Sequence, residues 1–96
     1  MLQFDSVEIE GHRFQFLQYA VGNAPLLVLR GKRGYVMCGY LDIETADRVG
    51  DVAVRVTGVR SLGDMLSATV RSVTGKAREL GIREGQSVRE ILGLIA

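Results

Sequence analysis

The sequence is poor in the residues that build cross-links and metal centres. Its 96 residues include a single cysteine, Cys38, and a single histidine, His12. One cysteine excludes an internal disulfide framework, and one Cys with one His falls short of the four ligands of a structural zinc site. We therefore expect no metal site within one chain, and a cytoplasmic location, where thiols stay reduced.

Long apolar runs and an excess of one charge are also lacking. No stretch approaches the roughly 18 apolar residues that a membrane span requires. Residues 1–10 carry acidic but no basic side chains, unlike a signal peptide. Twelve Lys and Arg against eleven Asp and Glu give a net charge of +1, so no overall field attracts polyanions. We expect neither nucleic acid nor a membrane as partner.

The chain is nevertheless rich in apolar residues for its size. Ninety-six residues correspond to one domain, which we assign to residues 1–96. Hydrophobic residues make up 47% of it, and the mean hydropathy is +0.15. A domain this small has a modest core, and monomers rarely expose large apolar patches. We therefore expect a homo-oligomer that buries the surplus between subunits.

The first half of the chain has the patterns of β-strands. Residues 2–10 and 12–19 flank a tight turn, and the second run alternates apolar with polar residues. The alternation of apolar and polar residues is shifted by one position between Phe4 and Val7, which predicts a bulge near Asp5 and Ser6. A third strand begins at Pro25, whose missing N–H suits a strand's first residue.

Two continuous apolar runs follow, at residues 26–29 and 35–38. Such runs are typical of strands covered on both faces, so we expect them at the centre of the sheet. The turn between them, residues 30–34, holds three cations and two glycines. It lacks the strand–loop–helix setting and the Lys-Ser/Thr ending of a phosphate-binding P-loop. We interpret its cations as surface charges that favour solubility.

The second half combines helices with one more strand. Asp42 can cap a short helix over 43–49, and Val52, Val54 and Val56 alternate as a fifth strand. Ser61 can cap a long helix that ends at Gly81, and a capping box opens a last helix over 88–95. The order β-β-β-β-α-β-α-α makes strands four and five parallel. We predict an α+β domain with a mixed five-stranded sheet, built from two hairpins and one parallel crossover, and the long helix packed on it.

A candidate site lies where strands four and five end. Ligands favour the carboxyl edge of parallel strands, and residues 38–42 and 57–61 leave that edge toward helix N-termini, which attract anions. Glycines there let a backbone approach a ligand, and an arginine supplies donors for a carboxylate or phosphate. The predicted ligand-binding residues are Cys38, Gly39, Asp42, Thr57, Gly58, Arg60 and Ser61.

Each chemical role has a structural alternative. Cys38 is a candidate nucleophile or redox thiol if a helix N-terminus lowers its thiol pKa, but it also ends an apolar run, as a buried inert cysteine does. Asp42 and Ser61 are explained equally well as helix caps, and Arg60 as a surface cation. His12 is expected to be a solvated turn residue.

Specific segments resemble a known family. The run Tyr-Val-Met-Cys-Gly-Tyr-Leu at 35–41, the flanking residues 24–27, and the closing Leu-Gly-Ile-Arg-Glu-Gly at 80–85 are similar to the YunC-like family of bacterial and archaeal proteins, known as domain of unknown function 1805. Asp42 stands where Asn is expected after the central run, and it keeps the capping role. The resemblance implies a small α+β domain without assigned activity and identifies no catalytic residue.

Three hypotheses follow for function. The leading one is a non-catalytic oligomer that binds an anionic small molecule or a partner protein at the edge of strands four and five. The second is a cysteine-dependent enzyme that uses Cys38. The third is a structural subunit of a larger assembly. The sequence does not identify a cofactor, and the cofactor is unknown.

Overall fold

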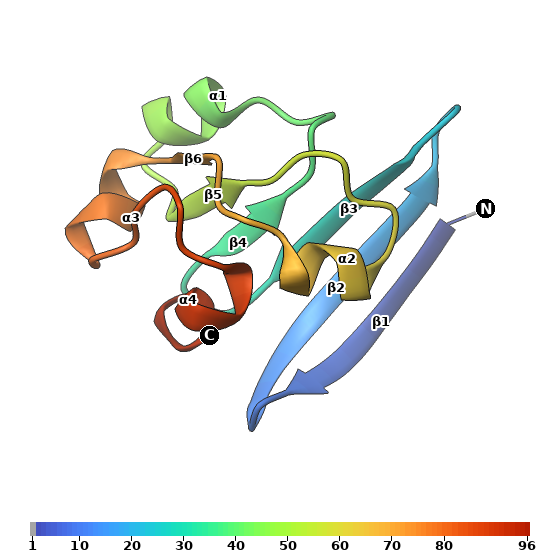
Figure 1. Ribbon diagram of the computed structural model, residues 1–96, viewed down its shortest axis with the longest axis horizontal. Coiled ribbons are helices and arrows are strands. Elements are labelled where there is room, and N and C mark those ends of the chain that lie inside the picture. The colour runs from blue at the N-terminus through green and yellow to red at the C-terminus, as the bar shows by residue number, and fades with distance from the viewer. Residues whose placement is uncertain (1) are drawn as a thin grey trace.

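The computed structural model describes residues 2–96, which form one mixed sheet with short helices on both faces (Figure 1). The six strands are hydrogen-bonded in chain order, from β1 to β6. No helix among the described residues is long and apolar enough to cross a membrane. In chain order the elements are β1 (Leu2–Ile9), β2 (His12–Ala20), β3 (Pro25–Arg30), β4 (Tyr35–Met37), α1 (Ile43–Arg48), β5 (Ala53–Arg55), α2 (Leu62–Ser67), β6 (Ser72–Val73), α3 (Gly75–Glu79) and α4 (Val88–Ile95).

The predicted α+β class and the parallel crossover are confirmed. β4 pairs with β5 in parallel, from Tyr35 opposite Ala53 to Met37 opposite Arg55. All the other strand pairs are antiparallel. Helix α1 makes the crossover between β4 and β5, so both strands end at the same edge of the sheet.

The predicted bulge in the first strand is wrong. β1 and β2 pair without interruption from Leu2 opposite Tyr19 to Ile9 opposite His12. The apolar phase changes because Phe4 and Val7 lie on opposite faces of an unbroken strand. Val7 packs against the main core, whereas Phe4 is 61% exposed on the other face.

The predicted long helix is also wrong, because residues 62–80 form three elements. Helix α2 ends at Ser67, and β6 then pairs with β5 through Val73 opposite Val54. This pairing adds a sixth strand to the five that were predicted. The helix stops because residues 69–74 contain four β-branched side chains, which favour extended backbone. Thr74 then begins α3: its hydroxyl accepts the Ala77 N–H at 3.2 Å.

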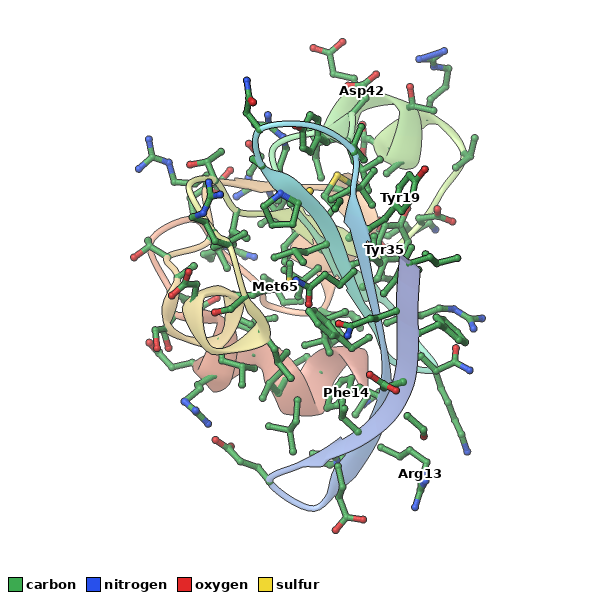
Figure 2. All side chains as sticks on the ribbon, turned by 90° about the vertical axis from the view of Figure 1, so that its right-hand side faces the viewer. Arg13, Phe14, Tyr19, Tyr35, Asp42 and Met65 are labelled. Atoms are coloured by element: carbon green, nitrogen blue, oxygen red, sulfur yellow. The ribbon has the colours of Figure 1, made fainter. Side chains whose placement is uncertain are left out.

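The two faces of the sheet are covered unequally. Helices α2, α3 and α4 lie over the main core, which includes Phe14 and Met65. On the other face α1 covers only a small cluster around Met37 and Ala53. Figure 2 shows Met65 and Phe14 on one side of the sheet and Tyr19 and Tyr35 on the other. β4 is therefore buried on both faces, as predicted, but β3 is not.

Candidate functional site

The predicted site residues gather at one end of the sheet, which we call the carboxyl end. It is formed by residues 38–42 after β4, residues 57–61 after β5, and the turn 21–24 between β2 and β3. These segments border an open cavity of about 310 Å³. Four predicted residues line it, together with four that were not predicted: Cys38, Gly39, Gly58 and Arg60, and Ala24, Pro25, Tyr40 and Val59.

The other three predicted residues, Asp42, Thr57 and Ser61, do not line the cavity. Asp42 caps α1: one carboxylate oxygen accepts the Glu44 N–H at 3.1 Å, and the other accepts the Thr45 hydroxyl at 2.7 Å. The Thr45 hydroxyl first, and the Glu44 N–H second, hold the pKa of the Asp42 carboxyl below its ordinary value. Ser61 caps α2 in the same way, through the Asp64 N–H. Both residues have structural roles at helix ends.

The two helix N-termini are not brought together. Helix α1 packs against the Met37 face of the sheet and α2 against the main core, so the two helices lie on opposite faces of the sheet. Each has only six residues, and its own capping side chain occupies a backbone N–H of its first turn. What faces the cavity is therefore loop backbone and side chains rather than a pair of helix dipoles.

Arg60 closes the cavity on one side. Its guanidinium donates to the Asn23 carbonyl oxygen at 3.2 Å, which joins the β5–α2 segment to the turn between β2 and β3. Its backbone N–H donates to the Asp64 carboxylate at 3.0 Å. Within residues 2–96 the bond to Asn23 is the only hydrogen bond of the guanidinium, which has five N–H donors. Arg60 is also the one charged residue among those that line the cavity.

Cys38 is buried at the inner wall of the cavity. Its side chain is 3% exposed, and its sulfur accepts the Leu27 N–H at 3.3 Å. A nucleophilic thiol needs a base nearby. Leu27 lies opposite Gln18, and His12 is six residues further along β2, or about 20 Å at 3.3 Å per residue. His12 is therefore not positioned to activate Cys38.

Arg55 was missed by sequence reasoning, although it shapes the site. Its guanidinium donates to the Leu41 carbonyl oxygen at 3.1 Å and to the Gly39 carbonyl oxygen at 2.9 Å. Two bonds from one side chain fix the segment that follows β4. The alternation of residues 52–57 marked Arg55 as solvent-facing, and only the pairing of β4 with β5 shows that a loop lies above it. Among residues 2–96, no group of three or more His, Cys, Asp or Glu side chains is arranged to hold a metal ion.

Comparisons with known proteins agree with this fold and assign no activity. The family described as "Domain of unknown function (DUF1805)" matches residues 37–95. The "Uncharacterized protein YunC" of Bacillus subtilis (strain 168) is 35% identical in an alignment 96 residues long, and the alignment covers 96% of this chain and 95% of that protein. The crystal structure of a protein of unknown function, TA1206 from Thermoplasma acidophilum, superposes with a TM-score of 0.96 at 48% identity, over 100% of this chain and 94% of that one.

Proposed function

We propose a binding function for this chain, which belongs to the family described as a domain of unknown function (DUF1805). The carboxyl-end cavity binds a small molecule that carries one carboxylate and an apolar body, and it does not convert that molecule chemically. The observation that carries the proposal is the cavity itself, with the Arg60 guanidinium as its single charged group.

The lining favours a single negative charge over several. A guanidinium can donate two parallel N–H bonds to one carboxylate, and the bond to Asn23 leaves Arg60 donors for this purpose. The neighbouring side chains of Pro25 and Val59 are apolar. A volume of about 310 Å³ lies at the small end of the range for ligand pockets, about 300–1,000 Å³. These features suit a short-chain or aromatic monocarboxylate.

Titration calorimetry with butyrate and benzoate tests this proposal. We expect the carboxylates to bind the wild-type protein and to lose about tenfold or more in affinity in Arg60→Ala, because a hydrogen bond to a charged group is lost. Arg71→Ala is the matched control for the loss of an arginine. Arg71 is exposed, and its side chain forms no hydrogen bond with any of residues 2–96. Equal affinity in the two variants would contradict the proposal, and so would the absence of carboxylate binding. The carboxyl terminus of a partner protein offers the same chemistry, and tight binding of a peptide only with a free C-terminal carboxylate would identify that source.

The burial of Cys38 favours binding over cysteine catalysis. A thiolate must be reachable to act as a nucleophile, and this side chain is 3% exposed with its sulfur bonded to a backbone N–H. We expect a thiol reagent to modify Cys38 at the rate of unfolding. Rapid alkylation of the native protein near neutral pH would support the cysteine-dependent enzyme instead.

We further propose that two copies of the chain associate through the uncovered sheet surface, which we call the open face. Its apolar part consists of two cross-strand rows, Leu2–Tyr19–Leu26 and Phe4–Leu17–Val28, and the polar row Ser6–Gln15–Arg30 continues the same face. Leu2, Phe4 and Tyr19 are 62%, 61% and 45% exposed. With about 150–250 Å² per aromatic side chain, the three expose on the order of 300 Å², the size of the largest patch on a typical monomer. That is a substantial part of the roughly 800 Å² that each partner contributes to a standard interface.

A second copy suits the open face because an apolar surface can pack against a copy of itself. A two-fold axis brings the same apolar rows together as two packed sheets. Sedimentation velocity tests this: we expect a dimer for the wild type and for Val49→Lys, which alters the exposed apolar residue that follows α1, but a monomer for Phe4→Lys. A monomeric wild type, or a Phe4→Lys variant that remains dimeric, would contradict association through this face.

A further inference from the structure

A second cavity lies at the opposite end of the sheet, which we call the turn end. The turn end comprises the β1–β2 turn, the β3–β4 turn and the C-terminus of α4. The cavity has a volume of about 300 Å³ and is lined by Ser6, Arg13, Phe14, Gln15, Arg30, Gly31 and Lys32. Three of these residues are cations and none is acidic. The carboxyl-end cavity has only one cation, so the two cavities differ in charge.

Neutral side chains hold the two arginines. Arg13 donates to the Ser6 hydroxyl at 3.2 Å, and Arg30 donates to the Gln15 amide oxygen at 2.9 Å. Pairing places Ser6, Gln15 and Arg30 in one row across β1, β2 and β3. The guanidiniums are therefore oriented by the sheet while most of their donors are left for a ligand.

None of these three cations forms an ion pair with a carboxylate of residues 2–96. The ion pairs within residues 2–96 are Arg78–Glu84 and Arg89–Glu10, so Arg13, Arg30 and Lys32 have no acidic partner within 4 Å. Glu8 lies opposite Arg13 in the strand pair without forming such a pair. Three positive charges that line one cavity without an ion-pair partner favour an anion of more than one charge.

The turn that carries Lys32 is held firmly. The N–H groups of Arg33 and Gly34 both donate to the Ile95 carbonyl oxygen at 3.1 Å. The Arg33 guanidinium donates to the carbonyl oxygens of Gly93 at 2.8 Å and Ala96 at 3.2 Å. Helix α4 therefore fixes the turn, and a site formed beforehand loses less entropy when a ligand binds.

We propose that the turn-end cavity binds a small molecule that carries a phosphoryl group. A phosphate offers several oxygens to two guanidiniums and one ammonium at once, and arginine pairs with phosphate through parallel N–H bonds. The three cations line one cavity and do not form a long basic stripe, and the protein is nearly neutral overall. Both features favour a small molecule over a nucleic acid. The sequence alone led us to interpret the cations of residues 30–34 as surface charges. The structure adds Arg13 of the β1–β2 hairpin, which lines the same cavity as Arg30 and Lys32. The proposal is independent of the carboxyl-end cavity.

Titration calorimetry with pyrophosphate as the probe tests this assignment. We expect binding by the wild type that weakens as salt screens the charges, and affinities lower by about tenfold or more in Arg13→Ala and in Arg30→Ala. Arg71→Ala and Arg60→Ala are expected to bind as the wild type does, so a failure at the carboxyl end leaves this result intact. The Lys32 side chain forms no hydrogen bond within the described part of the chain, and the affinity of Lys32→Ala for pyrophosphate is expected to fall as well.

Three outcomes would overturn the proposal: no pyrophosphate binding by the wild type, equal affinity in the cavity variants and in Arg71→Ala, or a mixed-sequence DNA duplex bound more tightly than pyrophosphate. The last outcome would assign the cations to nucleic acid. Circular dichroism of each variant establishes that a lost affinity does not reflect a lost fold.

Discussion

The two ends of the β-sheet are held in different ways. At the turn end, a Cβ atom added to Gly31 would collide with the backbone carbonyl of Ile95, so the β3–β4 turn touches the end of α4 directly. At the carboxyl end, a Cβ on Gly39 would lie 3.7 Å from the Arg55 guanidinium and 3.8 Å from a Thr57 methyl, which are ordinary contacts. Main-chain contacts therefore fix the turn beside the basic cavity, whereas the atoms next to Gly39 at the carboxyl end belong to side chains that can adjust.

Alanine substitutions of these glycines test the difference most strongly. We expect Gly31→Ala to lower the free energy of unfolding by about 3 kcal/mol, because backbone atoms cannot move aside cheaply. Gly39→Ala has room and is expected to change it by less than about 1 kcal/mol in either direction. Urea denaturation of both variants measures these changes. Similar losses would show that the two ends are equally constrained.

A second pair of variants concerns the threonines near the two ends. The buried Thr74 hydroxyl donates to the Asp51 carbonyl oxygen at 2.7 Å and accepts the N–H groups of Ala53 and Ala77. Thr74→Val leaves these groups without a partner, and we expect a loss of about 2 kcal/mol. Thr57 is exposed at the carboxyl end, so Thr57→Val should change the stability by less than about 0.5 kcal/mol. Thermal unfolding of both proteins distinguishes the two residues, and a Thr74→Val variant as stable as the wild type would be inconsistent with this role.

The smallest expected effect is a shift in the titration of Tyr35 at the turn end. Burial first, and then the 2.7 Å hydrogen bond to Asp51, raise the pKa of Tyr35 from 10.0 to about 12. The folded state favours the neutral phenol of Tyr35. The contribution of this group to the free energy of unfolding is therefore complete below pH 10 and is lost as the pH rises from about 10 to about 12. Asp51→Asn removes the carboxylate charge but not the burial, so an ultraviolet titration should show this pKa only partly lowered. An unchanged value would mean that Asp51 does not contribute.

The sequence predicted those parts of the fold that depend on local patterns. The β1–β2 hairpin, the two apolar central strands and the parallel crossover follow from alternation, turn residues and element order. The predictions were wrong where the structure of a segment depends on a tertiary contact with another segment. β6 exists because β5 has a free edge to pair with, and residues 69–74 were counted toward an amphipathic helix whose apolar stripe they also fit. Phe4 suggested a bulge because its side chain lies on the open face.

The candidate site shows the same division. The element order placed Gly39, Gly58 and Arg60 beside one another, and these residues line a common cavity. The order did not show which face each helix would cover, so the helix N-termini were expected to converge. The turn-end cavity combines Arg13 and Arg30, which no local pattern relates. Only the register of β2 against β3 brings these two side chains to one cavity.

The most direct test of two separate binding ends is a backbone amide NMR titration of the wild-type protein with butyrate and then, in a fresh sample, with pyrophosphate. We predict that butyrate shifts the amide signals of Gly39, Gly58 and Arg60 and leaves Gly31 and Lys32 unchanged, and that pyrophosphate does the reverse. If both probes shift the same set of amides, or neither shifts either set, the assignment of one ligand class to each end of the sheet is contradicted.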